Sequence, residues 1–195
     1  MRELGFGRSL APALPLALVL GLGALSCGER GSEAESGGEP GRALHRLVAE
    51  GDAHFHARRY VEAAERYREA TRQFPDEAGP YFQFGHALLA AGEFRVSARA
   101  LEQGLRRDPE WPRKRFLLRD FFSNPGEVDA QVEALKARVE ARPKDADAWF
   151  LLGYLLHFSP ERASARRVFQ ETLSAAPDHP GAVAFLVVEE DEGAP

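Results

Sequence analysis

The residues best suited to chemistry in this 195-residue sequence are six histidines and one cysteine. His54 and His56 are two residues apart and would point to different sides of a helix, and His45 has no suitable spacing to His56. A glycine-rich phosphate loop, a nucleophile elbow and a His-Glu-x-x-His motif are all missing from the sequence. The sequence therefore predicts no metal site, no cofactor and no enzymatic activity.

The composition predicts a helical protein. Apolar residues make up 44% of the chain and charged residues 28%, which is enough apolar content for a folded core. Isoleucine is absent and threonine occurs only at Thr71 and Thr172, whereas the helix formers Ala, Leu, Arg and Glu are abundant. The formal net charge of −5 disfavours general nucleic-acid binding. We expect an all-α protein without a nucleic-acid partner.

The N-terminal segment has the layout of an export signal. Arg2 and Arg8 precede an uncharged apolar run, Ser9–Ser26, which ends directly before the single cysteine, Cys27. A positive start, a short apolar middle and small residues at the end are typical of a signal peptide. We assign residues 1–26 to this signal peptide.

The sequence Ala24-Leu25-Ser26-Cys27 resembles the lipobox of bacterial lipoproteins. The resemblance implies that the Cys27 thiol carries a lipid, and that Gly28 after it does not retain the protein in the inner membrane. The expected location is the bacterial cell envelope, as a lipoprotein of the outer membrane facing the periplasm. A single-pass anchor and an ordinary secretory signal are the alternatives. Residues 27–42, rich in Gly, Ser and Glu, are expected to form a lipid-anchored flexible linker.

A period of 34 residues organises the rest of the chain, because Pro75, Pro109, Pro143 and Pro177 recur at that interval. Each period contains two helical patterns, and the proline follows the second. The predicted repeats of this helical domain, residues 43–190, are 44–77, 78–111, 112–145 and 146–179. The predicted helix pairs are Leu44–Ala57 with Tyr60–Gln73, Pro80–Ala91 with Phe94–Arg107, Arg113–Phe122 with Glu127–Ala141, and Ala146–Phe158 with Glu161–Ala175. We expect a closing helix, Gly181–Glu190, and an acidic tail at 191–195.

These periods resemble the tetratricopeptide repeat, whose unit is an antiparallel helix pair with small and large residues at fixed places. The fourth unit carries most of the pattern, in Trp149, Leu152, Gly153, Ala165, Phe169 and Pro177. The first and second units carry it in Gly51, Ala63 and Tyr67, and in Gly85, Ser97 and Leu101. The resemblance implies an all-α, TPR-like α-solenoid of about four helix pairs plus a C-terminal capping helix.

The third repeat departs from the pattern, because Arg119 and Gln131 stand where the family has small residues. Two helices approach to about 8 Å only where one of them offers a small side chain. Gly51 is therefore expected to face Ala63 closely in the first pair. The third pair is expected to be splayed or shifted, with the Ser123-Asn124-Pro125-Gly126 turn absorbing the change.

The resemblance also predicts a concave groove lined by the first helix of each pair. The residues expected in this partner-binding groove are Phe55, His56, Phe82, His86, Phe116, Asp120, Phe150, Tyr154 and His157. Such a row of rings suits an apolar or helical peptide segment. The alternative is that the same rings pack between neighbouring helices and stabilise the fold.

Together these expectations describe a non-enzymatic scaffold or adaptor, tethered to a membrane through Cys27, that binds one protein partner in its groove. Two alternatives stay open at this point. One is an accessory or regulatory subunit of an envelope enzyme, and the other is a small-molecule or glycan binder that uses the aromatic groove.

Overall fold

The computed structural model describes residues 38–192, with side chains to residue 188, and this part of the chain contains helices and no strands. Its α-helices are α1 (Glu39–His56), α2 (Tyr60–Gln73), α3 (Ala78–Ala90), α4 (Phe94–Arg107), α5 (Gly126–Ala141), α6 (Ala146–His157), α7 (Ala165–Ala175) and α8 (Pro180–Glu192). Three short 3₁₀ helices also occur, η1 (Trp111–Arg113), η2 (Leu118–Phe121) and η3 (Arg162–Ser164). The predicted all-α class is confirmed.

The ends of the described region correct two predicted boundaries. Helix α1 begins at Glu39, so the last residues of the predicted linker, 27–42, are helical. Pro40 in the first turn and the acidic Glu39 both favour a helix start there. Helix α8 extends to Glu192, into the predicted acidic tail. The predicted signal peptide and Cys27 lie outside the described residues.

The recurring prolines set the ends of α2, α4, α5 and α7. Each of these helices stops two residues before the proline of its period. A residue that precedes proline is disfavoured in the helical region of φ and ψ. The four pre-proline residues accordingly have φ between −129° and −145°, the end values belonging to Phe74 and Ala176. The 34-residue period is therefore a period of helix ends.

In three helix pairs, a glycine on the first helix makes room for one large side chain from the second helix. A Cβ added to Gly51 would lie 2.4 Å from the Tyr67 ring. A Cβ on Gly85 would lie 2.6 Å from the Leu101 side chain, and one on Gly153 would lie 2.6 Å from the Phe169 ring. The expectation that Gly51 faces Ala63 is thus corrected, because its nearest neighbours are atoms of the Tyr67 ring. The small residue admits a large side chain to the interior of the pair.

The third repeat lacks its first helix. The predicted helix Arg113–Phe122 is replaced by η1, an extended stretch and η2, so the change is larger than the expected splay. Large side chains of this segment take up tertiary contacts instead: Trp111 stacks on Phe82 with ring centroids 3.7 Å apart. The Leu118 N–H donates to the Phe158 carbonyl at 2.9 Å, and its side chain is fully buried. Arg119, which cannot enter a tight helix pair, is consistent with this arrangement.

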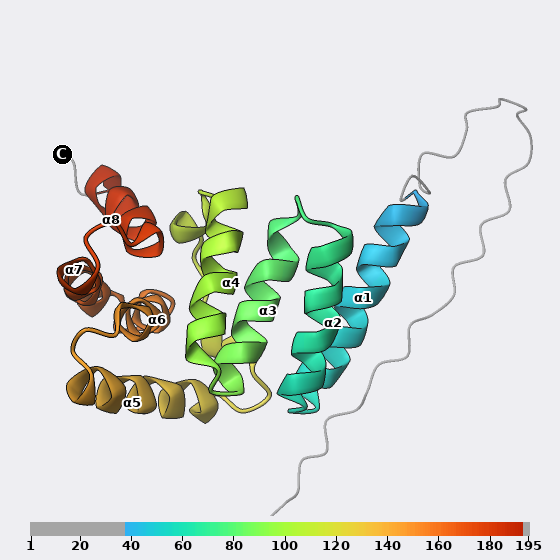
Figure 1. Cartoon of the computed structure of the whole chain (residues 1–195). Coiled ribbons are helices and arrows are strands. Elements are labelled where there is room, and N and C mark those ends of the chain that lie inside the picture. The colour runs from blue at the N-terminus through green and yellow to red at the C-terminus, as the bar shows by residue number, and fades with distance from the viewer. Residues whose placement is uncertain (1–37, 193–195) are drawn as a thin grey trace, which may run out of the picture. The chain divides into compact units, whose positions relative to one another are not determined.

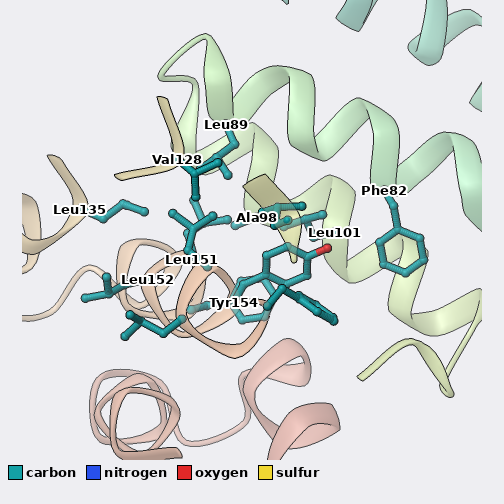
Figure 2. Packing of buried hydrophobic residues seen from close by; sticks show 14 of the residues in the cluster. Phe82, Leu89, Ala98, Leu101, Val128, Leu135, Leu151, Leu152 and Tyr154 are labelled. Carbon is teal, nitrogen blue, oxygen red and sulfur yellow. The ribbon is translucent and has the colours of Figure 1, made fainter. Parts of the chain in front are cut away.

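The direction of the helices changes after this segment. Figure 1 shows α1 to α4 side by side, α5 lying crosswise to them, and α6 and α7 seen nearly end-on. As a result α6 packs against α4 as well as against α5 and α7. Figure 2 shows the core that forms where these elements meet, with Leu101 from α4, Leu135 from α5 and Tyr154 from α6.

Helix α8 occupies the place of the first helix of a further repeat. It begins at Pro180, 34 residues after α6 begins at Ala146. A Cβ on Gly181 would lie 2.5 Å from the Phe150 ring, so the helix start packs closely on α6. Ala182 and Phe185 are fully buried, and α8 contacts α4, α6, α7 and η1. The helix covers apolar side chains that the last pair would otherwise expose.

Candidate functional site

An open hollow of about 420 Å³ lies among α1, α2, α3 and the segment that contains η1 and η2. Its wall combines Phe, Tyr and Trp rings with one carboxylate, one amide and two histidines. The lining residues are Asp52, Phe55, His56, Tyr67, Gly79, Phe82, Gln83, His86, Trp111 and Phe121. The hollow therefore combines α1, α2 and α3 with the segment that replaces the missing helix of the third repeat.

Asp52 is the carboxylate of the hollow. Its Oδ1 accepts a hydrogen bond from the Tyr67 hydroxyl at 2.7 Å and one from Gln83 Nε2 at 3.3 Å. Burial, followed by the hydrogen bond to Asp52, raises the pKa of Tyr67 above its usual value of 10.0. The Tyr67 hydroxyl is therefore protonated at neutral pH and donates. These two donors hold the Asp52 carboxylate at the junction of α1, α2 and α3.

His86 lies in the wall as a neutral ring. Its Nε2 is 2.8 Å from the Tyr154 hydroxyl, which also accepts a hydrogen bond from Trp111 Nε1 at 3.1 Å. The indole N–H can only donate, so the Tyr154 hydroxyl oxygen accepts from Trp111 while the same hydroxyl bonds to His86 Nε2. Burial lowers the pKa of His86 to about 3. The ring thus adds no positive charge to the hollow at neutral pH.

One ring of the hollow is largely open to solvent. Phe121 is 46% exposed, and its ring is nearly parallel to that of His86, with centroids 6.4 Å apart. The edge of the neighbouring Phe116 ring packs on it at 5.3 Å. An exposed aromatic side chain beside an apolar concavity offers surface that an apolar group from a ligand can cover.

Four of the nine predicted groove residues border this hollow: Phe55, His56, Phe82 and His86. His56 is exposed, whereas Phe55, Phe82 and His86 are only 6%, 1% and 7% exposed and pack between neighbouring helices. Phe116 and Asp120 are near the hollow but not among its lining residues. Phe116 is half-buried and stacks on Phe158 at 4.3 Å, while Asp120 is exposed on η2.

The groove assignment is wrong for Phe150, Tyr154 and His157. Their exposed fractions are 0%, 0% and 1%, and the rings of all three contact Phe185 of α8. His157 Nε2 also lies 2.8 Å from the Pro112 carbonyl oxygen. Because α8 and η1 cover this side of α6, the open groove does not continue along it. The alternative, that these rings stabilise the packing of neighbouring helices, holds here.

Six residues of the hollow stand outside the nine predicted groove residues: Asp52, Tyr67, Gly79, Gln83, Trp111 and Phe121. Asp52 precedes Phe55 by three residues and His56 by four, so helical spacing alone predicts all three on one face of α1. Trp111 and Phe121 lie on the short 3₁₀ helices of the segment that replaces the predicted α-helix, and α-helical spacing gives no signal for their positions.

Among residues 38–192, no helix has both the length and the apolar character required to cross a bilayer.

Comparison with solved structures finds two crystal structures of MamA. One has a TM-score of 0.37 and 18% sequence identity, over 78% of this chain and 84% of that chain. The other has a TM-score of 0.32 and 17% identity, over 73% of this chain and 94% of that chain. Curated protein sequences gave no match.

The family described as tetratricopeptide repeat matches residues 47–78, 82–118 and 126–180, more than half of the chain. Together with the 34-residue spacing of its helix ends, this match shows that the chain belongs to the tetratricopeptide repeat family.

Proposed function

We propose that this protein is a non-enzymatic scaffold, tethered to a membrane through a lipid on Cys27, that binds a segment of one partner protein in the hollow. The family supports a role in protein interaction, and the hollow supplies a surface for it. The observation that carries the proposal is the aromatic concavity of about 420 Å³ with Phe121 exposed at its wall.

The chemistry of the wall defines what the partner presents. Phe121 is exposed and Trp111 half-buried, the rings of Phe55 and Phe82 are buried behind the wall, and His86 is neutral, so an apolar or aromatic side chain gains most by entering. Asp52 adds a single anionic acceptor, which suits a backbone N–H or a basic residue of the same segment. The partner segment therefore carries an apolar anchor with a donor group beside it.

Capture of the partner by crosslinking tests this proposal, with the full-length chain in membranes as bait. Phe121→Ala removes the exposed ring, and we expect partner capture to fall about tenfold, as for an interface anchor. Val61→Ala is the matched control, because Val61 is 63% exposed on α2 and does not line the hollow. Equal capture by wild type and Phe121→Ala, with both variants folded, would exclude the hollow as the binding site.

A small-molecule ligand is the second candidate, because the volume of the hollow lies within the roughly 300–1,000 Å³ range of small-ligand sites. A compound that raises the melting temperature of wild type but not of Phe121→Ala, in the absence of any captured protein, would favour this function over the scaffold. A captured envelope enzyme would instead identify the protein as an accessory subunit.

A further inference from the structure

A cluster of three ionisable side chains lies away from the hollow, at the junction of α4, α6 and the turn before α8. It consists of Glu102 from α4, Asp147 from the first turn of α6, and His179, which directly precedes Pro180 at the start of α8. One ligand atom from each residue lies within 4.8 Å of the other two. The cluster joins α4 of the second repeat with α6 and the turn before α8, both in the fourth repeat.

His179 points its Nε2 atom at the two carboxylates. Nε2 is 3.3 Å from Oε1 of Glu102 and 3.9 Å from Oδ1 of Asp147, and it makes no hydrogen bond to another described residue. The side chain is 6% exposed. A buried ring nitrogen without a hydrogen-bond partner, aimed at two carboxylate oxygens, is an arrangement that a bound cation completes.

The cluster lies largely out of solvent. The exposed fractions of the His179, Glu102 and Asp147 side chains are 6%, 15% and 33%. Two carboxyl groups and an imidazole are therefore held together in a partly desolvated place, where a bound cation is poorly replaced by water.

We propose that Glu102, Asp147 and His179 bind a divalent transition-metal ion, with Zn²⁺ as the best match to one imidazole and two carboxylate ligands. Zn²⁺ holds nitrogen and oxygen ligands at about 2.0–2.2 Å, so the three ligand atoms, which lie within 4.8 Å of one another, must draw closer together around the ion. Bound metal links α4, α6 and the start of α8. It thereby fixes the capping helix to the second and fourth repeats.

One feature favours Zn²⁺ over Ca²⁺ or Mg²⁺. Imidazole nitrogen is a ligand for zinc, whereas the hard cations take oxygen. His179 therefore makes the cluster a better match to a transition-metal ion than to either of them.

Binding requires one proton to move. The Ala182 N–H faces His179 Nδ1 at 3.4 Å, which places the ring proton of the metal-free protein on Nε2. Coordination at Nε2 shifts that proton to Nδ1 and gives up the long contact with Ala182. The energy of chelation by three ligands offsets this loss.

Titration of the full-length chain, purified in detergent and stripped of metal, tests the site. We expect wild type to bind one Zn²⁺ at this site and to melt about 5 °C higher at a hundredfold excess over Kd, with no shift from Ca²⁺ or Mg²⁺. Co²⁺ as a spectroscopic probe should give visible absorption bands from nitrogen and oxygen coordination. A wild-type Kd weaker than about 1 mM for Zn²⁺ would overturn the proposal without reference to any variant.

The near-isosteric changes Asp147→Asn and Glu102→Gln each remove one ligand charge, and we expect each to weaken Zn²⁺ binding at least tenfold and to remove the Co²⁺ bands. His179→Gln should do the same. Asp129→Asn is the matched control, because Asp129 is an exposed carboxylate on α5 outside the cluster, and it should bind as wild type. Unchanged affinity in Asp147→Asn, with folding verified by circular dichroism, would assign the ion to other histidines and refute the site.

Discussion

His86 makes the stability of the fold depend on pH, because it is buried beside Tyr154 without a charge partner. Its pKa is about 3 in the folded protein and about 6.5 in the unfolded chain, so between these values the unfolded state binds more protons. The free energy of unfolding should therefore fall as the pH drops below 6.5. Protonation of this residue should lower the free energy of unfolding by about 2 kcal/mol between pH 7.5 and pH 5.0. Urea unfolding at the two pH values measures this difference.

The variant His86→Gln isolates this effect, since an amide can replace the hydrogen bond to Tyr154 but does not titrate. We expect its stability difference between pH 7.5 and 5.0 to be smaller than that of wild type by about 2 kcal/mol. His179, whose pKa is also lowered, contributes in the same direction and stays present in both proteins. His45→Gln, at an exposed position of α1, serves as control. An equal pH difference in wild type and His86→Gln would contradict the prediction.

Gly153 shows why the small residue of a helix pair is required. A Cβ there would lie 2.6 Å from the ring of Phe169, which is fully buried and stacked on Phe185 at 4.8 Å, so the ring has no space to move. Gly153→Ala should lower the free energy of unfolding by about 1–3 kcal/mol. In Gly41→Ala, on α1, the new Cβ meets no atom within 4 Å, and the change should stabilise by roughly 0.5–1 kcal/mol. Denaturant unfolding of both variants measures the two changes. A loss of stability in Gly153→Ala only would show that the limited space at Gly153 is the cause, since replacing a helical glycine by alanine otherwise stabilises.

At the scale of elements, α8 should act as a structural cap whose loss exposes the interior of the fourth repeat. Phe185 is fully buried, and its ring stacks on Phe169 and packs edge-on against His157 at 4.6 Å. Phe185→Ala should therefore cost about 3–5 kcal/mol of unfolding free energy. Val187→Ala, on the same helix but 52% exposed, should change it by less than about 0.5 kcal/mol. Similar losses in both variants would mean that helix formation, and not burial, is what matters.

The ends of the helices could be predicted from the sequence, but the third repeat could not. Proline acts on the residue before it, so Pro75 and its equivalents fix helix ends through local backbone geometry. The segment from Trp111 to Phe121 is instead decided by contacts with distant residues, such as the stacking of Trp111 on Phe82 and the bond from Leu118 to Phe158. The apolar spacing of a single segment contains no information about those partners.

At the scale of the whole molecule, the same distinction explains what could be predicted of the sites. Helical spacing predicts which faces of α1 and α3 Phe55 and Phe82 occupy, but not that their rings are 6% and 1% exposed, because that burial depends on neighbouring elements. The end of the groove at α6 depends on α8 returning over it, which is a tertiary event. The cluster of Glu102, Asp147 and His179 joins separate repeats, and a search for ligand pairs on one helix could not find it.

The proposed attachment to the membrane rests on one thiol, that of Cys27. If Cys27 carries lipid, Cys27→Ala should move the protein from the membrane fraction to the soluble fraction, because each buried acyl CH₂ contributes about 0.8 kcal/mol to membrane binding. Fractionation, with mass spectrometry of the N-terminal peptide, measures this directly, and Phe121→Ala is a control that should stay with the membrane. A Cys27→Ala protein that remains in the membrane would indicate a single-pass anchor. A wild-type protein in the soluble fraction would indicate an ordinary secretory signal, and both results exclude the lipid tether.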